Sequence, residues 1–325
     1  MKQPRPRVRT PEEALDPRIR EFAAQMAISY GRHPALDTLS YSEGRRIVEE
    51  VRAPWRTGGP QMLRTTEHQV PVPGGTLRIR VYDPGPAGRK AALIYMHGGG
   101  FTYFSIDTHD RVMREYAARG GFAVIGVDYP LSPETKFPVP HDQIVALIHW
   151  LVANGDAVGV DGRRLVVGGD SAGANLSMAA CLQLRDTGHP GLIRGMLLNY
   201  GGFASDSSDE ASLEYGGPGF MLTRDEIRFF FGNYIRGPED ARNPLACPLL
   251  ADVTGLPPAF LVIPECDVLT EQSHAMEQKL RQSGVPVRSK VYTGATHSFL
   301  EAVSIAPIAA EALEDGAQWV KQAVN

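Results

Sequence analysis

The chain has 325 residues, of which 43% are hydrophobic, a size that suits one large α/β domain with an appendage or two small domains. Its net charge of −4 is spread over both signs, so neither nucleic acid nor a membrane surface is an expected partner, and no apolar run predicts a membrane-spanning helix. The cysteines, Cys181, Cys247 and Cys266, are odd in number and form no C-x-x-C pair, which argues against a disulfide framework and predicts a reducing, cytoplasmic location.

Helical patterns come first along the chain. Residues 1–10 are rich in proline and arginine and lack an apolar core, so they are not typical of a secretory signal. Amphipathic patterns follow at residues 18–29 and 41–51. We therefore predict N-terminal cap helices over residues 1–66 and a catalytic domain over residues 67–325.

Short β-rich runs then alternate with helical patterns. The expected strands are residues 77–82, 91–96, 123–129, 165–168, 196–200, 259–263 and 288–292. The expected helices are residues 143–152, 174–184, 273–280 and 308–320. This alternation predicts an α/β fold with a mostly parallel central sheet and helices on both faces. Residues 203–236 interrupt it with an acidic, glycine-rich stretch and an aromatic cluster, which predicts a cap insertion over the carboxyl edge of the sheet.

The segment His97-Gly98-Gly99-Gly100 directly follows the expected strand at residues 91–96. Its glycines leave backbone N–H groups able to approach a developing negative charge. A phosphate loop is the competing interpretation, but no Gly-Lys-Ser/Thr follows. We therefore interpret the segment as one side of an oxyanion hole, with His97 bracing the loop.

Gly169-Asp170-Ser171-Ala172-Gly173 matches the pattern G-x-S-x-G between an apolar strand and an expected helix. That context is typical of a nucleophile elbow, which presents a serine hydroxyl on a sharp strand-to-helix turn. Glycines as turn punctuation are the plainer interpretation of the pattern alone. The strand on one side and the helix on the other favour Ser171 as a nucleophile.

A nucleophilic serine needs a base and an acid that orients the base. His297 follows a late strand through a short turn containing glycine, whereas His274 lies inside a helical pattern. For the acid, the strand at residues 259–263 is followed by Glu265 and Asp267, and Asp267 is the better placed on the loop. The resulting chain order is Ser, Asp, His, the order used by α/β-hydrolases.

With these residues, the chain resembles the hormone-sensitive-lipase-like branch of the α/β-hydrolases, and within it the bacterial acetyl esterases. The resemblance covers about residues 70–322. Its matching segments are His97-Gly98-Gly99-Gly100-Phe101, Asp107-Thr108-His109-Asp110, Asp128-Tyr129-Pro130-Leu131-Ser132-Pro133-Glu134, Gly169-Asp170-Ser171-Ala172-Gly173 and Thr296-His297-Ser298-Phe299.

The resemblance implies an α/β-hydrolase fold with a helical cap and assigns roles to matching residues. Ser171, Asp267 and His297 look like the triad. The backbone N–H groups of Gly98, Gly99 and Ala172 resemble the oxyanion hole. Glu134 and Asp170 resemble polar residues near the serine. For each of them, a buried hydrogen bond that holds a loop is an equal alternative. A homodimer is also implied.

The chain departs from the family pattern at two places. Where relatives commonly have a glycine after the oxyanion loop, this chain has Tyr103 and Phe104, which we expect to narrow the substrate pocket. The acid loop Asp267-Val268-Leu269-Thr270-Glu271 lacks the family's usual proline but keeps the carboxylate.

The sequence therefore predicts a serine carboxylesterase that needs no cofactor or metal. It would hydrolyse small esters with short acyl chains through an acyl-enzyme intermediate. Two alternatives stay open. One is a deacetylase or amidase of aryl or carbohydrate groups, and the other is a ligand-binding receptor on a hydrolase scaffold.

Overall fold

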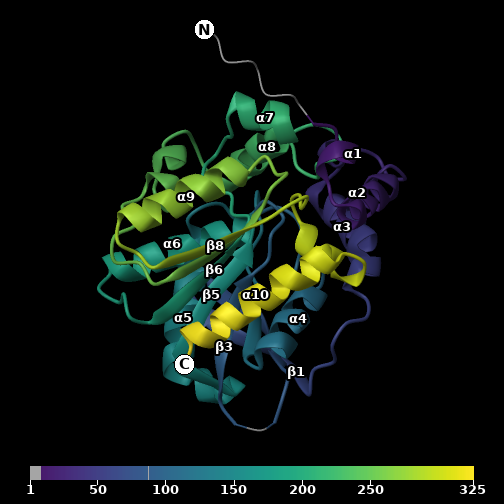
Figure 1. The fold of residues 1–325 in the computed structure, drawn as a ribbon. Helices are drawn as coiled ribbons and strands as arrows, with labels where there is room; N and C mark the ends of the chain where they lie inside the picture. The colour runs from purple at the N-terminus through teal and green to yellow at the C-terminus, as the bar shows by residue number, and fades with distance from the viewer. Residues whose placement is uncertain (1–8, 87) are drawn as a thin grey trace.

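A central sheet organises the molecule (Figure 1). The computed structural model describes residues 9–86 and 88–325, so the prediction about residues 1–10 falls mostly outside the described residues. The strands are β1 Arg64–Val72, β2 Gly75–Asp83, β3 Lys90–Met96, β4 Ala123–Asp128, β5 Val160–Asp170, β6 Ile193–Asn199, β7 Ala259–Pro264 and β8 Val287–Tyr292. Their order in the sheet is β1-β2-β4-β3-β5-β6-β7-β8. The β1–β2 and β2–β4 pairs are antiparallel, and the other pairs are parallel.

Helices cover the sheet on both faces. They are α1 Pro11–Ala14, α2 Pro17–Tyr30, α3 Tyr41–Arg56, α4 Asp110–Gly120, α5 Val139–Asn154, α6 Ala172–Asp186, α7 Asp209–Tyr215, α8 Arg224–Tyr234, α9 Thr270–Gln282 and α10 Pro307–Ala323. Short 3-10 segments are η1 Leu36–Thr38, η2 Gly155–Val158, η3 Asp240–Arg242, η4 Pro248–Leu250 and η5 Phe299–Ser304. The predicted mostly parallel sheet with helices on both faces is confirmed.

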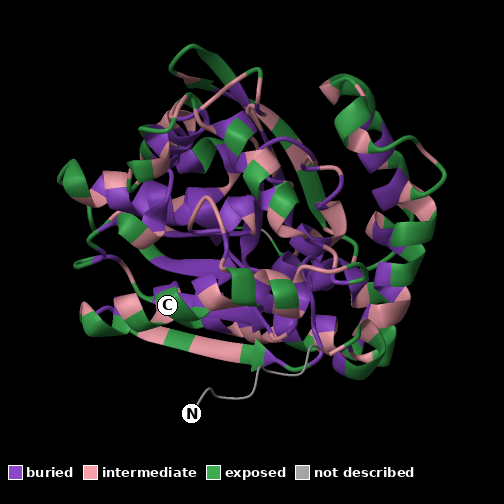
Figure 2. Ribbon diagram, turned by 90° about the horizontal axis from the view of Figure 1, so that it is seen from above, coloured by how far each residue is buried: buried purple, intermediate pink, exposed green. Residues whose placement is uncertain are grey.

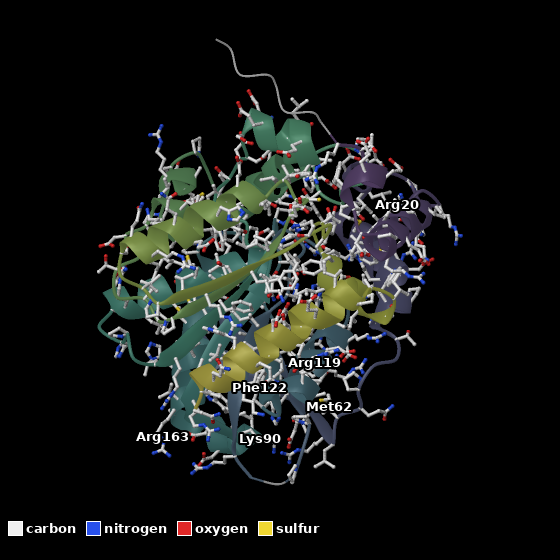
Figure 3. The ribbon with its side chains drawn as sticks, viewed as in Figure 1. Arg20, Met62, Lys90, Arg119, Phe122 and Arg163 are labelled. Carbon is white, nitrogen blue, oxygen red and sulfur yellow. The ribbon has the colours of Figure 1, made fainter. Side chains whose placement is uncertain are left out.

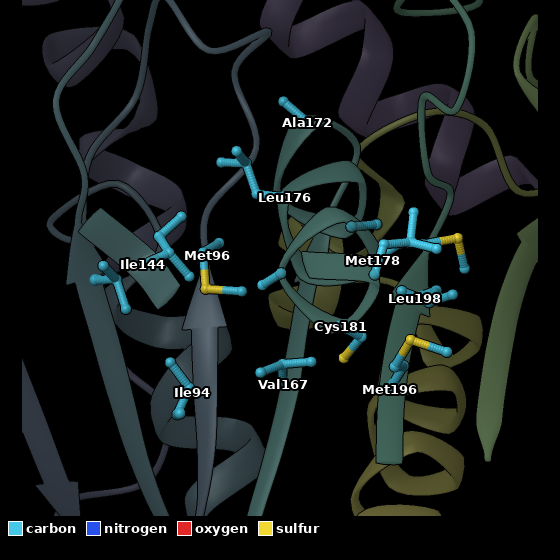
Figure 4. Close-up of a cluster of buried hydrophobic side chains, with 14 of the residues drawn as sticks. Ile94, Met96, Ile144, Val167, Ala172, Leu176, Met178, Cys181, Met196 and Leu198 are labelled. Atoms are coloured by element: carbon cyan, nitrogen blue, oxygen red, sulfur yellow. The ribbon is translucent and has the colours of Figure 1, made fainter. Parts of the chain in front are cut away.

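The strands divide the core because successive side chains point to opposite faces of the sheet. In β3, Ile94 and Met96 join one buried cluster with α5, α6 and α9, whereas Leu93 and Tyr95 join another with α4 and α10. Figure 4 shows the first cluster, where side chains of β3, β5 and β6 lie beside those of α6. Figure 2 shows that buried residues fill the middle of the molecule and that exposed ones lie mainly on the outer helices and loops.

The N-terminal helices lie at the carboxyl end of the parallel strands. In Figure 3, Lys90, where β3 begins, lies near the bottom, and Arg20 of α2 lies near the top. The segment that contains α7 and α8 lies beside these helices. Tyr41 of α3 donates a 2.8 Å hydrogen bond to Asn233 of α8 and stacks on Phe229. The carboxyl ends of the strands are thus covered by two segments far apart in sequence.

Each expected strand corresponds to one of β2 to β8, but β1, α4 and α8 were not predicted as such. Strand β1 is an edge strand in which only Val70 is buried, so it lacks the apolar alternation that identifies strands. Helix α8 did carry a signal, because Thr223 and Glu226 form a capping box ahead of its apolar residues. None of the helices in the described ranges has the length and apolar character needed to cross a bilayer.

Candidate active site

Ser171 lies on the turn between β5 and α6 in a conformation that few residues adopt. Its φ is 54° and its ψ is −116°. Positive φ costs a non-glycine residue on the order of 1–3 kcal/mol and persists only where the surroundings impose it. Here the serine N–H donates to the carbonyl oxygen of Asn199 at 2.9 Å, and its own carbonyl accepts from Ala174 and Asn175. The sharp strand-to-helix turn expected at Ser171 is present.

The two glycines of the elbow are required by a close approach to β3. A Cβ at either Gly169 or Gly173 would collide with the carbonyl oxygen of Met96, the last residue of β3. Because a backbone atom cannot move aside as a flexible side chain can, any larger residue would push α6 away from the sheet. The G-x-S-x-G spacing therefore allows the serine turn to pack against the strand that leads into the His97 loop.

Ser171, His297 and Asp267 form a continuous hydrogen-bonded chain. Ser171 Oγ lies 3.0 Å from His297 Nε2, and His297 Nδ1 lies 2.7 Å from Asp267 Oδ2. The other oxygen of Asp267 accepts from the backbone N–H of Leu269 at 2.9 Å. The structure thus brings together three residues that the sequence places on separate loops.

The alternative candidates lie elsewhere. His274 is half exposed on α9, 3.6 Å from Glu277. Glu265 accepts from the N–H of Gly294 at 2.9 Å and pairs with Arg9 at 3.1 Å. It therefore ties the acid loop to the histidine loop and does not approach the imidazole as Asp267 does.

Burial and the Asp267 carboxylate have opposite effects on the pKa of the His297 imidazole. Burial disfavours the charged form of His297, but the adjacent carboxylate and its hydrogen bond outweigh burial, so the pKa of His297 is raised above its ordinary value. A base of raised pKa accepts a proton from a hydroxyl more readily. The arrangement is able to take the Ser171 proton and to hold the resulting imidazolium.

The oxyanion-loop prediction needs one correction. The N–H of Gly98 donates to Asp170 Oδ1 at 3.1 Å, so it is not available to a ligand. Gly99 and Gly100, together with Ser171 and Ala172, line the main cavity, and within the described residues neither glycine N–H has a recorded partner. We therefore expect Gly100, rather than Gly98, to act beside Gly99 and Ala172. The sequence alone gave no way to see that a buried carboxylate takes the first N–H.

Asp170 is the centre of a buried network that holds this loop. It accepts from Tyr95 at 2.8 Å on one oxygen, and its other oxygen lies 3.2 Å from His109 Nε2. Burial alone would raise the pKa of Asp170, but the neighbouring His109 lowers it below its usual value. Asp170 is next to Ser171 in sequence and accepts a hydrogen bond from Gly98. His109 was quoted only within a family motif and was given no role of its own.

His97 and Glu134 have different positions. His97 is buried and stacks on Tyr129 with ring centroids 4.4 Å apart, and burial lowers its pKa to about 3. A neutral imidazole in this place supports the predicted bracing role. The contacts of Glu134 are closer to the alternative in which it holds a loop, although it is not buried: its side chain is 56% exposed and accepts two hydrogen bonds, at 3.0 and 2.7 Å, from Arg45. Arg45 also donates to the carbonyl of Thr102 at 2.9 Å, so Glu134 acts on the loop from outside.

The hydrogen-bonded chain opens into a cavity of about 610 Å³. That volume is within the usual range of small-molecule sites. Its walls are mostly apolar and come from α2, α3, the loop after Gly100 and the segment that contains α8. Tyr103 and Phe104 both line it, as predicted, and Tyr103 packs edge-on against Phe230 at 6.0 Å. A small, largely apolar molecule fits this space.

Known proteins are similar to this chain in sequence and in fold. Residues 93–301 match the family described as alpha/beta hydrolase fold. An acetyl esterase from Salmonella paratyphi A is 36% identical over 267 residues, which are 82% of each chain. The structure is similar to a hyperthermophilic esterase from the archaeon Pyrobaculum calidifontis, with a TM-score of 0.88, 31% identity and coverage of 95% of this chain and 98% of that one. An ester-hydrolase from the metagenome of Lake Arreo, complexed with a bipyridine phosphonate derivative, gives the same TM-score, identity and coverage.

Proposed function

The chain belongs to the alpha/beta hydrolase fold family, in its hormone-sensitive-lipase-like branch, and is a serine esterase. From this premise we propose that Ser171, His297 and Asp267 are its catalytic triad. The observation that supports the assignment is the unbroken chain of hydrogen bonds from Asp267 through His297 to Ser171. It ends at the cavity where a small ester would bind.

The proposed reaction has two halves. Ser171 Oγ attacks the ester carbonyl as His297 Nε2 takes its proton, and the N–H groups of Gly99, Gly100 and Ala172 bind the oxyanion. The N-terminus of α6 adds favourable partial positive charge there. His297 then returns the proton to the departing alcohol, which leaves an acyl-Ser171 ester. A water molecule, deprotonated by His297, attacks this ester; the bond to Ser171 Oγ then breaks as His297 returns the proton to Oγ, and the carboxylic acid product leaves.

We also propose that two segments form the cap, namely residues 1–66 and the insertion at about residues 203–236. Both contribute to the cavity wall, and Tyr41 bonds Asn233 between them. The boundary between the N-terminal cap and the catalytic domain, at residues 66 and 67, falls inside β1. The division therefore separates parts by their proposed role and not by where an element of structure ends. A cytoplasmic location and a homodimer stay predictions.

A labelling and turnover experiment tests the proposal. A fluorophosphonate, which reacts only with an activated serine, should label the protein stoichiometrically at Ser171. p-Nitrophenyl acetate should be hydrolysed far faster than the matched anilide, p-nitroacetanilide. The reverse preference would support the amidase alternative. Absence of both labelling and turnover in folded protein would support a non-catalytic receptor.

The acyl-chain preference follows from Phe104. A Cβ on Gly99 would lie 2.7 Å from the Phe104 ring, so this ring packs directly on the proposed oxyanion loop and limits space near the acyl carbon. Forcing extra methylenes against a packed wall typically costs about 1–3 kcal/mol. We expect kcat/KM for p-nitrophenyl esters to peak at about two to four acyl carbons, roughly 10-fold or more above about eight.

Phe104→Gly should shift that optimum to longer chains. The φ of Phe104 is 67°, a region that glycine occupies without strain, so the variant is expected to fold. A series that varies the alcohol at constant acetyl serves as the control, because its profile should move less. An optimum at eight or more carbons in the wild type, or an unchanged profile in the folded variant, would remove Phe104 as the gatekeeper.

A further inference from the structure

Arg52 is a buried arginine on α3 whose position the proposed mechanism does not explain. It is only 4% exposed, yet it lines the cavity that contains Ser171 and His297. Removing a guanidinium from water is costly unless a partner compensates its charge. Its surroundings must therefore provide that compensation.

Glu301 provides it. The Arg52 guanidinium and the Glu301 carboxylate are in direct contact, and the Glu301 side chain is 4% exposed. Burial disfavours the charged form of Arg52, but Glu301 and Tyr30 more than offset this, and the pKa of Arg52 is raised. Glu301 lies in η5, which follows directly from the His297 loop. The pair thus joins an N-terminal helix to the segment after the proposed base.

The ion pair leaves the guanidinium face free for a second contact. Among the residues that the structure describes, Arg52 Nε and Glu301 Oε2 have no hydrogen-bond partner, so the pair is not a two-pronged fork. The Arg52 Cζ lies over the Phe104 ring, 4.4 Å from its centroid. A planar guanidinium stacks on an aromatic face, whereas an ammonium group does not. Glu301 therefore holds the charge in place, with the Arg52 guanidinium over the Phe104 ring.

Phe104 transmits this contact to the site. The ring also packs against Gly99 of the proposed oxyanion loop and lies 5.5 Å from the His109 ring. A ring in contact with both Arg52 and Gly99 has little room to swing away when a longer substrate enters. Without the guanidinium, the ring would have room to turn toward α3 and enlarge the cavity.

We propose that Arg52, anchored by Glu301, is a specificity-determining positioning residue that fixes the Phe104 ring and thereby restricts the acyl group of the substrate to short chains. The proposal rests on the esterase function proposed above. It assigns to the N-terminal helices a selective role that a passive cover over the sheet would not have.

The test compares kcat/KM for p-nitrophenyl octanoate with that for the butyrate. Arg52→Met with Glu301→Gln removes both charges, so no unpaired buried carboxylate remains, and should raise the octanoate-to-butyrate ratio roughly 10-fold. Arg52→Lys keeps a charge for Glu301 but loses the flat face, and should raise the ratio by a smaller factor. Arg46→Met is the matched control, because Arg46 lies on the same helix, is 63% exposed and pairs only with Glu50 among the described residues.

Coupling to Phe104 completes the test. If Arg52 acts through the ring, Phe104→Gly should raise the ratio alone, and adding Arg52→Met and Glu301→Gln to Phe104→Gly should give no further rise, because the effects of contacting residues are not additive. An unchanged octanoate-to-butyrate ratio in the folded double variant overturns the proposal. So do additive effects of the Phe104 and Arg52 changes on this ratio. A shift of preference that appears only in the series that varies the alcohol also overturns it. If the double variant does not fold, an unchanged ratio in Arg52→Lys overturns it. Failure of the esterase function itself would appear separately, as wild-type protein without Ser171-dependent acetate hydrolysis.

Discussion

Ser171→Ala is expected to lower kcat for p-nitrophenyl acetate on the order of 10⁵- to 10⁶-fold, because the proposed covalent step has no other nucleophile at the end of the His297 hydrogen bond. Binding and the oxyanion groups would leave a small residual rate. The fold should persist, since alanine removes one oxygen and keeps the backbone of the elbow. Kinetics with circular dichroism and thermal unfolding measure both effects.

Ser298→Ala is the comparison. Ser298 also lines the cavity and has a positive φ, 61°. However, the hydrogen bond of His297 Nε2 is to Ser171 Oγ and not to Ser298. We expect Ser298→Ala to retain most of the turnover and all of the fluorophosphonate labelling, which Ser171→Ala should lose. Substantial acetate hydrolysis by a folded Ser171→Ala protein would show that the nucleophile has been misassigned.

Asp267→Asn is expected to lower kcat on the order of 10³- to 10⁴-fold, because a neutral amide no longer holds the imidazole in the tautomer that accepts from the serine. Glu265→Gln should lower kcat far less, since Glu265 contacts Gly294 and Arg9 and not the imidazole. Reversed losses in these two variants would assign the acid to Glu265.

The pH profile gives Asp267→Asn a second readout. His297 acts as a base only when neutral, so the activity should fall as the pH drops through its raised pKa. Asp267 is the main cause of that rise, against the opposing effect of burial. Its neutralisation should therefore move the acid limb of kcat/KM to lower pH. An acid limb that stays in place would mean that another group controls it.

Local sequence patterns were sufficient for the elbow and for most of the sheet. The runs at β3 and β5 are apolar because both faces of a parallel sheet are covered by helices, so they stand out without any knowledge of their partners. Gly169 and Gly173 are visible in the sequence, and the turn needs glycine at both positions because a Cβ there would collide with β3. By contrast, β1 has one solvent-facing edge and mostly exposed side chains, so no local pattern identified it.

By itself, the sequence determined which residues to propose as the reacting groups, namely a serine on a strand-to-helix turn, a histidine and an acid in α/β-hydrolase order, and a glycine loop after β3. Only the tertiary structure decided which N–H groups of that loop are free, because Asp170 turns its carboxylate toward Gly98 and leaves Gly99 and Gly100 facing the cavity. It also decided the surroundings of Phe104, since the Arg52 and Glu301 that meet beside it come from α3 and η5. Contacts between such distant segments depend on how the helices pack over the sheet, and no spacing along the chain encodes them.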